Sequence, residues 1–600
     1  MLLATPTYCA SRFTYARRRT REVQIGTVAV GGTQPIRVQS MTTTRTQDIE
    51  ATLAQTIRLI DVGCEIVRIT APTVTDAQAI GEIRRRLTAK GILVPLVADI
   101  HFSPAAALEA AEYVDKVRVN PGNFADQKFF RVREYTDEDY AAEIARIEER
   151  FTPLVLKCKA RGVAMRIGSN HGSLSDRIMN RHGDTPAGMV ESALEFVRIA
   201  RKHDYHDIVL SMKASNPKVM IQAYRLLVAR MDEQGLDPYP LHLGVTEAGL
   251  GEDGRIKSAI GIGALLDDGL GDTVRVSLTE EPEAEVPVAQ RLVEPYNLGL
   301  HAARAYPEVT ERVDPYSYSR RLSSSVYIGG LPVGGGATVA IVDPPEEALL
   351  STAGVSDSVR SDRVEIQSIF SASANVEDLD LSVGEAVTSR QIDSSVRASA
   401  GPLDLSGLAR LDAPVPWYDA VRHYRSLVAE AGDRPLHLEV AVDGDDLEVL
   451  LRTSTVLGSL LCDGLGDSVA VQAPGSDEDH LRLLFNVLQA AGVRITKTEF
   501  VSCPSCGRTL FDLQSTTERI ASRTSHLKGV KIAIMGCVVN GPGEMADADF
   551  GYVGGSPGKV NLYVGKDVVE KAVPEASADS RLVDLIRRHG KWVDPPLIAS

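Results

Sequence analysis

Short apolar and β-branched runs alternate with amphipathic runs between about residues 20 and 295. After a predicted hairpin at 23–32, eight segments have the composition of buried strands: IRVQSM (36–41), EIVRIT (65–70), LVPLVADI (93–100), KVRVNP (116–121), VAMRIGS (163–169), DIVLSMK (207–213), LHLGVTE (241–247) and TVRVSL (273–278). Each is followed by a stretch with helical spacing, for example 51–63 and 217–231. This alternation predicts an α/β fold built on a (β/α)8 TIM barrel. An open doubly wound sheet would usually carry a glycine fingerprint after its first strand, and none is present.

The middle of the chain repeats the end of this pattern. A glycine-rich hairpin is predicted at 322–342 and an exposed Ser/Asp-rich loop at about 351–405. Residues 241–249 then recur at 436–444, and 263–277 recur at 458–472, both 195 positions later and with ten of fifteen positions identical in the second pair. We therefore expect a duplicated, degenerate barrel. The predicted organisation is a basic leader (1–20), a catalytic barrel (21–298), a barrel-like spacer (299–495) and a small α+β C-terminal unit (496–600).

Composition narrows the function classes. With 65 Lys and Arg against 80 Asp and Glu, the net charge of −15 argues against a nucleic-acid binder that works through overall positive charge. Seven scattered cysteines do not form a disulfide framework, which favours a reducing compartment, the bacterial cytoplasm. Five arginines and no acid in residues 1–21 resemble a transit segment, so a plastid is the alternative. The charge-free stretch 322–342 is too rich in Ser, Gly and Pro to predict a membrane span.

Charged and polar residues follow the predicted barrel strands, where barrel active sites are found. They are Arg68, Asp99, His101, Arg118, Asn120, Arg166, Asn170, Lys213, Glu247, Arg275 and Ser277. Five cations at one barrel mouth predict a binding site for a small polyanion. The planar guanidinium group of Arg and the ammonium group of Lys both bind phosphate oxygens. Any one of them could instead form a structural ion pair. Asp99, His101 and Glu247 are the candidates for handling protons. In the second copy Val442 and Ala470 replace Glu247 and Arg275, which predicts that this copy has no activity.

The last hundred residues contain three cysteines with metal-ligand spacing. Cys503 and Cys506 form a C-x-x-C pair, and Cys537 follows 31 residues later. Three thiolates are one short of a complete zinc or four-iron set. Glu544, after the NGPG turn, and His526 are the candidates for the fourth ligand. A cubane with one labile oxygen ligand could open an iron to substrate, whereas a structural zinc site is the simpler alternative.

Nine ordered motifs together resemble one known family. They are ADIHF, RVNPGN, RIGSNHGSL, SMKAS, LGVTEAG, IKSAIGIG, GDTVRVSL, CPSCGRT and GCVVNGPGE, spread over about 20–295 and 496–600. In this order they resemble the 4-hydroxy-3-methylbut-2-enyl diphosphate synthases of the methylerythritol phosphate route to isoprenoids. The middle region is similar to the spacer of the family's large, three-domain form.

The resemblance implies reductive ring opening and dehydroxylation of 2-C-methyl-D-erythritol 2,4-cyclodiphosphate. Two electrons would come from ferredoxin or flavodoxin through a [4Fe-4S] cluster. The implied cluster ligands are Cys503, Cys506, Cys537 and Glu544. The implied diphosphate ligands are Arg68, Arg118, Arg166, Lys213 and Arg275, with hydrogen bonds from Asn120, Asn170 and Ser277. Asp99, His101 and Glu247 would lie near the carbon skeleton, with Glu247 delivering a proton.

The cluster unit must close over a barrel mouth so that an iron meets the substrate and water is kept out. Two-domain members of the family do this as head-to-tail homodimers. Here the spacer could let the unit reach its own barrel, and a homodimer is the alternative. Three other readings of the sequence remain open: a zinc-stabilised barrel that binds a phosphorylated ligand, a pterin-type barrel transferase, and a cluster dehydratase that needs no electron donor.

Overall fold

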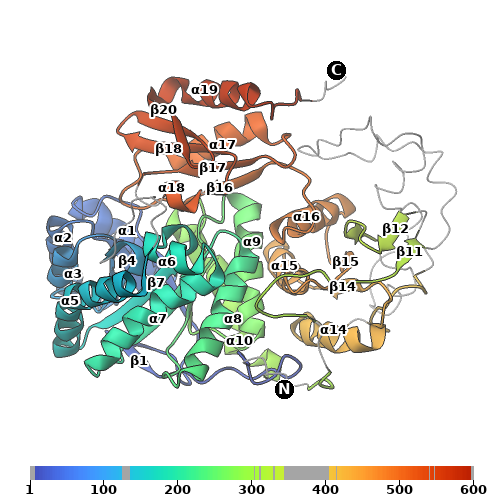
Figure 1. Cartoon of the computed structure of the whole chain (residues 1–600), viewed down its shortest axis with the longest axis horizontal. Coiled ribbons are helices and arrows are strands. Elements are labelled where there is room, and N and C mark those ends of the chain that lie inside the picture. Colours follow the sequence, from blue (N-terminus) through green and yellow to red (C-terminus); the bar gives the residue numbers. More distant parts are fainter. Residues whose placement is uncertain are drawn as a thin grey trace.

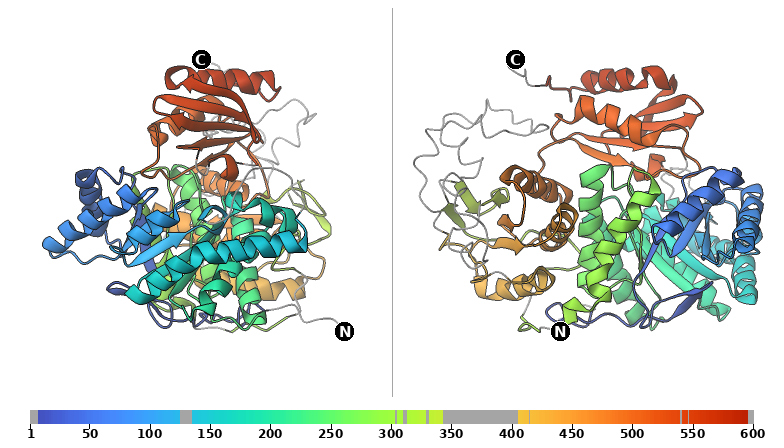
Figure 2. Two further views of the ribbon diagram at one scale, coloured as in Figure 1. Left: turned by 60° about the vertical axis from the view of Figure 1, so that its left-hand side comes forward. Right: turned by 180° about the vertical axis from the view of Figure 1, so that it is seen from behind.

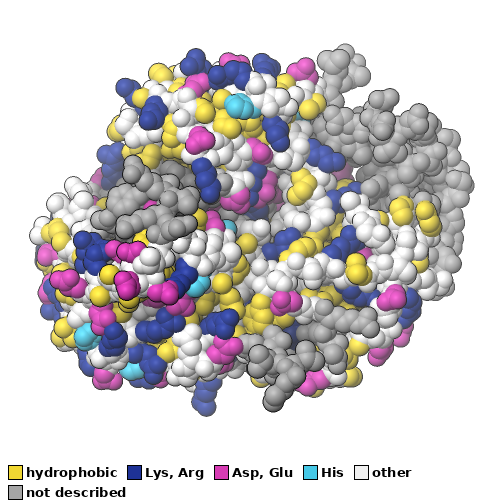
Figure 3. Space-filling model, in the orientation of Figure 1, with side chains coloured by type: hydrophobic (Ala, Val, Ile, Leu, Met, Phe, Trp, Pro, Cys, Tyr) yellow, Lys and Arg dark blue, Asp and Glu magenta, His cyan; other side chains and the backbone are white. Residues whose placement is uncertain are grey.

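The computed structural model describes residues 7–124, 135–302, 305–309, 313–328, 331–342, 405–413, 415–538, 541–545 and 547–595. Nearly all of the loop expected at 351–405 and the first six residues of the expected leader lie outside these ranges. Within them, no helix combines the length and apolar character needed to cross a membrane. On the face of the molecule shown in Figure 3, basic and acidic side chains are interspersed.

Eight parallel strands form the N-terminal barrel, as the sequence pattern predicted (Figure 1). They are β3 (Arg37–Met41), β4 (Ile66–Thr70), β5 (Leu96–Ile100), β6 (Lys116–Val119), β7 (Ala164–Asn170), β8 (Ile208–Lys213), β9 (His242–Leu243) and β10 (Thr273–Val274). Their order in the sheet is β8-β7-β6-β5-β4-β3-β10-β9, and a bridge between Leu210 and Leu241 brings the two ends together. These strands could be predicted from the sequence because strands buried on both faces are continuous apolar runs.

Helices surround the barrel: α1 (Ile49–Asp61), α2 (Val74–Ala89), α3 (Pro104–Ala110), α5 (Asp137–Arg161), α7 (Pro186–Lys202), α8 (Pro217–Glu233), α9 (Gly251–Asp267) and α10 (Glu285–Asn297), with the short α4 (Pro121–Phe124) and α6 (Asp176–His182). Their starts are encoded locally. At α2, for example, Thr73 and Asp76 form a capping box. The hairpin β1 (Val23–Ile25) and β2 (Val28–Val30) packs against the first residues of the strands and fills the end of the barrel opposite the active-site mouth.

The middle of the chain repeats part of the barrel. Its elements are the hairpin β11 (Ser325–Ile328) and β12 (Leu331–Gly334), strands β13 (Ala340–Ile341), β14 (His437–Ala441) and β15 (Ser468–Gln472), and helices α14 (Trp417–Ala431), α15 (Asp446–Cys462) and α16 (Asp477–Ala490). The sheet order β13-β15-β14 reproduces β3-β10-β9 of the barrel. Strands β14 and β15 repeat the last two barrel strands with their helices, as the 195-residue repeat predicted, and β13 adds a counterpart of the first strand.

The two copies pack on each other through equivalent helices, α9 and α15, in a reciprocal way. Gly263 lies against Thr455, and Gly458 lies against Ile260. Gly458 and Thr455 stand 195 positions after Gly263 and Ile260, so each contact is the counterpart of the other. This is the pattern of a two-fold interface, here between two parts of one chain.

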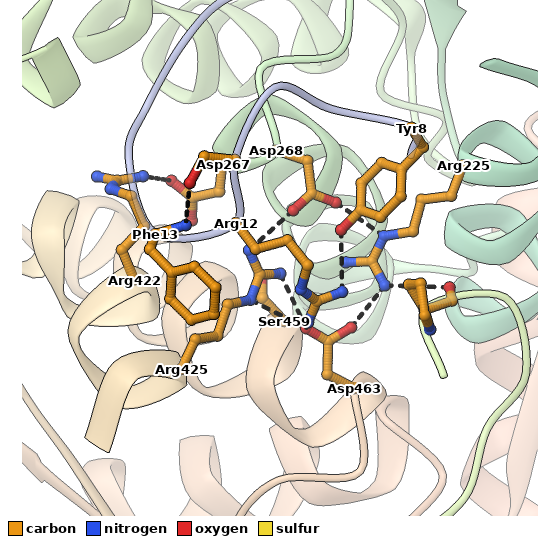
Figure 4. A network of polar contacts seen from close by, with 12 residues as sticks. Tyr8, Arg12, Phe13, Arg225, Asp267, Asp268, Arg422, Arg425, Ser459 and Asp463 are labelled. Atoms are coloured by element: carbon orange, nitrogen blue, oxygen red, sulfur yellow. Dashed lines mark hydrogen bonds and ion pairs between the residues drawn. The ribbon is translucent and has the colours of Figure 1, made fainter. Parts of the chain in front are cut away.

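A buried ring of charges extends the interface between the two copies, which we call the seam (Figure 4). Arg225 on α8 and its counterpart Arg425 on α14 each bind both Asp268 and Asp463, which are themselves 195 positions apart. The four N–O distances are 2.6–2.9 Å. All four side chains are buried, so each charge must be compensated by an opposite one. The alternation of arginine and aspartate around the ring provides that compensation.

The described part of the expected leader is built into the same seam. Arg12 donates to Asp463 at 2.9 Å and to the Tyr8 hydroxyl at 2.9 Å (Figure 4). Tyr8, Arg12 and Phe13 are buried, and Arg17 pairs with Asp272 at 3.2 Å. From Tyr8 onward this segment is part of the folded chain.

The C-terminal sheet unit consists of β16 (Glu499–Ser502), β17 (Lys531–Met535), β18 (Phe550–Ser556), β19 (Lys559–Val564) and β20 (Asp567–Pro574), with α17 (Leu513–Thr524), α18 (Gly541–Glu544) and α19 (Glu575–Arg588). Figures 1 and 2 show it above the barrel, with α18 on the side facing the barrel and α19 on the far side. Lys257 of α9 donates to Glu499 at 3.0 Å, and the Thr279 and Ser502 hydroxyls lie 2.6 Å apart. The unit therefore contacts the barrel of its own chain.

Candidate active site

A single cavity lies between the barrel mouth and the C-terminal sheet unit. Its barrel wall contains ten of the side chains expected from the sequence: Arg68, Asp99, His101, Arg118, Arg166, Asn170, Lys213, Glu247, Arg275 and Ser277. Its opposite wall contains Cys503, Cys506, Cys537 and Glu544. Residues from the ends of seven barrel strands thus meet the cysteine motifs of a unit more than two hundred residues away in sequence.

Asn120 is the expected site residue that does not line this cavity. Its side-chain oxygen accepts a hydrogen bond from the Gly122 amide at 3.3 Å. Its Nδ2 is buried without a partner in the described chain. In this structure Asn120 shapes the turn after β6, which is the local role that Asn has in turns.

Three of the five cations have carboxylate partners. Arg118 binds Asp99 at 3.0 Å, and Arg68 lies 3.9 Å from the same carboxylate. Arg275 forms a two-pronged pair with Glu285, at 3.0 and 2.9 Å, and all four atoms are buried. Glu285 was not foreseen, because a Glu at the start of a helix gives no sequence signal of what it faces. Arg275 therefore forms a structural ion pair, which the sequence analysis gave as the alternative to anion binding.

Arg166 and Lys213 differ from the other cations, since neither has an ion pair within the described residues. Both are buried, and Nε and Nη1 of Arg166 have no hydrogen-bond partner there. Burial lowers the pKa of Lys213 well below its usual value, and Arg166 and Arg68 lower it further. Crowded buried cations without counter-charges are costly to keep. Their arrangement suits an anionic ligand that would supply the missing charge.

Asp99 and His101 are held in fixed protonation states. Burial tends to raise the pKa of Asp99, but Arg118 and Arg68 hold it well below the usual value. Burial, together with the Arg508 guanidinium, lowers the pKa of His101 to about 3. At neutral pH Asp99 is thus ionised and His101 is neutral, with its Nε2 3.5 Å from Asp99. This pair is suited to orienting groups more than to delivering protons.

Glu247 is the acid in the cavity that keeps its proton. Burial raises its pKa well above the usual value, and the neighbouring Glu544 raises it further. Glu247 also has a left-handed backbone (φ +49°), which is uncommon for a residue other than glycine and directs its side chain away from the ordinary strand path. Glu544 accepts a hydrogen bond from Asn170 Nδ2 at 2.6 Å. One oxygen of each carboxyl group, Oε2, is buried and has no partner in the described chain.

The three cysteines are not joined in disulfides and face the same cavity. The Gly536 amide donates to Cys503 Sγ at 3.3 Å, and Arg508 Nε donates to Cys506 Sγ at 3.4 Å. Such donors favour the thiolate, the form that binds metal, while burial raises the pKa of the Cys503 thiol well above its usual value. No compact set of three His, Cys, Asp or Glu ligands for a single ion is present among the described residues. Three thiols and a carboxylate on one cavity wall are a donor set that fits a multi-iron cluster, whose ligands bind different irons.

His526, the other candidate for a fourth ligand, lies elsewhere. Its Nε2 is 2.9 Å from the Val593 carbonyl oxygen, and its ring packs edge-on to Trp592. A second hollow surrounds these residues between α17 and α19, but no cysteine lines it. His526 therefore does not join the cysteines.

Arg508 and Met41 are among the cavity-wall residues that the sequence analysis did not single out. Arg508 lies in the CPSCGRT motif but was not singled out, although it follows Cys506 by two positions and points back to its sulfur. Met41 Sδ accepts from both Arg68 (2.7 Å) and Arg275 (3.0 Å). A methionine at a strand end has no chemical signature that would separate it from core residues.

A parallel barrel with crowded cations at its mouth, covered by a thiol-bearing unit, defines an anion-binding barrel enzyme. Two family models match the chain, the GcpE TIM-barrel domain over residues 20–290 and the GcpE protein C-terminal domain over residues 499–588. A relative from Akkermansia muciniphila, named 4-hydroxy-3-methylbut-2-en-1-yl diphosphate synthase (flavodoxin), is 49% identical over 607 residues, covering 98% of this chain and 99% of its own. The Arabidopsis thaliana protein, named as the ferredoxin-dependent chloroplastic synthase, is 45% identical over 676 residues, covering 100% and 91%.

The chain belongs to the family of 4-hydroxy-3-methylbut-2-en-1-yl diphosphate synthases. The resemblance inferred from the motifs is thereby confirmed. Among solved structures, a dihydropteroate synthase from Xanthomonas albilineans aligns with a TM-score of 0.30 and 13% identity, over 47% of this chain and 99% of its own. That similarity is too low to bear on function.

Proposed function

We propose that this chain converts 2-C-methyl-D-erythritol 2,4-cyclodiphosphate to 4-hydroxy-3-methylbut-2-enyl diphosphate. The conversion takes up two electrons and two protons, opens the cyclic diphosphate and releases one oxygen as water. The observation that carries the proposal is the cavity shared by the cations of the barrel and the three cysteines of the C-terminal sheet unit. The names of the relatives support reduced flavodoxin or ferredoxin as the electron donor.

In this proposal Arg166 and Lys213 bind the diphosphate directly, because they lack carboxylate partners in the described chain. Arg68 and Arg118 add charge while anchored to Asp99, and Arg275 contributes the nitrogen that now faces Met41. Asn170 and Ser277 line the same wall and supply hydrogen bonds. Asn120 acts through the turn after β6.

Cys503, Cys506, Cys537 and Glu544 would hold a [4Fe-4S] cluster. The three thiols outside disulfides, the N–H donors to Cys503 and Cys506, and the Glu544 Oε2 without a partner in the described chain fit such a group. When bound, the cluster supplies single electrons and an iron that accepts an oxygen ligand. Glu247 holds a proton beside this position and delivers it to the departing hydroxyl. The contacts between barrel and C-terminal sheet unit exclude water from the site.

The proposal includes the division of the chain expected from the sequence, with a catalytic barrel at 21–298, a spacer at 299–495 and a cluster unit at 496–600. In this arrangement the cluster unit serves the barrel of its own chain. Three contacts between the two support this: Lys257 with Glu499, Thr279 with Ser502 and Asn170 with Glu544.

Turnover by anaerobically purified protein tests the proposal. With reduced flavodoxin or ferredoxin and the cyclodiphosphate, we expect formation of 4-hydroxy-3-methylbut-2-enyl diphosphate, and no product when the donor is omitted. Consumption of the cyclodiphosphate without a donor, with loss of water to an unreduced product, would indicate a non-redox dehydratase. Binding without turnover, by a colourless protein that contains zinc, would leave only the anion-binding barrel. Either result would overturn the proposal.

A further inference from the structure

The barrel and the C-terminal sheet unit approach each other closely at one glycine. Gly172 lies directly after β7, in the short turn His171–Ser173, and opposite it lie Gly543 and Glu544 of α18. The backbone of Gly172 is not in the left-handed region, so its conformation alone does not require glycine. The requirement comes from what faces it.

A side chain at this position would collide with backbone. A Cβ built on Gly172 lies 2.3 Å from both the carbonyl carbon and the oxygen of Gly543, and 2.4 Å from the Glu544 nitrogen. Backbone atoms cannot rotate away as a flexible side chain can. These three nearest atoms all belong to the C-terminal sheet unit and none to the barrel. An added methyl group would therefore oppose closure of the cavity more than folding of the barrel.

The same turn also fixes the Glu544 carboxylate. Asn170, two residues before Gly172, donates to Glu544 Oε1 at 2.6 Å, while Arg118 Nη2 donates to Asn170 Oδ1 at 3.2 Å. Glu544 is only 6% exposed. The barrel segment 170–172 thus sets both the backbone position of α18 and the direction of the Glu544 carboxylate. Through Asn170 it also connects this carboxylate to Arg118.

We infer that Gly172 is a positioning residue for this reaction: its missing side chain lets the segment that carries Glu544 close against the barrel mouth. The inference rests on the proposed function, because its test measures the response to the cyclodiphosphate and turnover. It predicts that a Gly172→Ala enzyme folds, retains its iron and still binds the cyclodiphosphate in the barrel. In this variant the C-terminal sheet unit is held away from the bound substrate.

The test uses the full chain, loaded with iron and purified anaerobically. For Gly172→Ala we expect iron content and melting temperature close to those of the unmodified protein. The change in the electron paramagnetic resonance spectrum on adding cyclodiphosphate should be lost. Turnover should fall on the order of 10²-fold, as for a misplacement of about 1 Å. The matched control is Gly407→Ala, also without left-handed backbone, where the nearest atom to a new Cβ, Val326 Cγ1, is 3.4 Å away.

An unchanged spectral response and turnover in Gly172→Ala would overturn the inference. If the unmodified protein itself shows no response to the cyclodiphosphate, the proposed function fails instead, so the two failures are distinguishable. Should Gly172→Ala not fold, hydrogen exchange on the unmodified protein decides. Addition of the cyclodiphosphate should protect 170–174 and 541–545 together, and protection of only one of these segments would contradict the inference.

Discussion

The cations of the barrel mouth are not equivalent, although the sequence presents them as one ring. Arg275 is neutralised by Glu285, whereas Lys213 and Arg166 have no acidic partner in the described chain. A paired buried arginine stabilises the fold, because its removal leaves a buried carboxylate without a partner. An unpaired buried cation is available to a ligand. Substitutions at these positions should therefore separate binding from stability.

We expect Lys213→Met to weaken cyclodiphosphate binding by about 10- to 150-fold, the equivalent of about 1.5–3 kcal/mol for a charged hydrogen bond. Its melting temperature should be largely unchanged, since no ion pair is lost. Arg275→Met, the matched change, should lower the melting temperature strongly because Glu285 is stranded. Calorimetric titration and thermal melting give both quantities. Undiminished binding by Lys213→Met would show that this lysine does not meet the ligand.

The protonation of Glu247 should appear in the pH dependence of turnover. Burial raises its pKa and the neighbouring Glu544 raises it further, so the carboxyl group keeps its proton to a higher pH than an exposed glutamate does. As pH rises through that raised value the proton is lost and kcat should decline. Glu247→Gln has no proton to give, so its kcat should be about 10²- to 10⁴-fold lower and should lack that decline. A Gln variant with the profile of the unmodified enzyme would exclude Glu247 as the donor.

At this scale the sequence predicted most of the wall of the cavity but little of its pairing. Residues at strand ends could be named because parallel strands bring those ends together. The partner of Arg275 could not be named, since Glu285 reaches its position through packing of the following helix, whereas Arg508 lies two residues after Cys506 and was overlooked. Asn120 shows the converse: it lies at a strand end, yet its side chain turns back to the Gly122 amide.

At the scale of the elements, the seam between the barrel and the middle copy contains buried charges that the sequence analysis did not predict. Arg225 and Arg425 alternate with Asp268 and Asp463, and Arg12 joins them from the N-terminal segment (Figure 4). All five side chains are buried. The sequence repeat predicted a second copy but not the face through which it packs. Reciprocal contacts at glycines of α9 and α15 depend on interhelical distance, which no one-dimensional pattern records.

Asp463→Asn should destabilise this seam by about 3–5 kcal/mol, because three buried arginines lose a shared counter-charge. The control is Asp232→Asn, whose side chain is 44% exposed and pairs with Arg18. There we expect a change below about 1 kcal/mol. Chemical denaturation of both variants gives the comparison. Equal stability of the two would mean that the ring contributes nothing net to the packing of the copies.

Over the whole molecule, the C-terminal sheet unit lies on the barrel of its own chain, and the middle copy packs on α9 (Figures 1 and 2). A face that is used within the chain is not available to a second chain. We therefore expect a monomer in solution whose activity is proportional to its concentration.

Mixing two inactive variants tests this arrangement. Glu247→Gln impairs the barrel and Cys537→Ser impairs the thiol set, so each chain lacks one half of the cavity. If the site forms within a chain, the mixture should remain as inactive as its parts. Recovery of activity, or a dimeric mass by light scattering, would show that cluster unit and barrel meet between chains.

The most direct test of the account is the iron, sulfide and zinc content of anaerobically purified protein, with its absorption spectrum before and after dithionite and then cyclodiphosphate. We predict about four irons and four sulfides per chain, no zinc, bleaching on reduction and a further change with the substrate. One zinc per chain and no visible absorption would contradict the account, since the cavity would then bind an anion without the centre needed to reduce it.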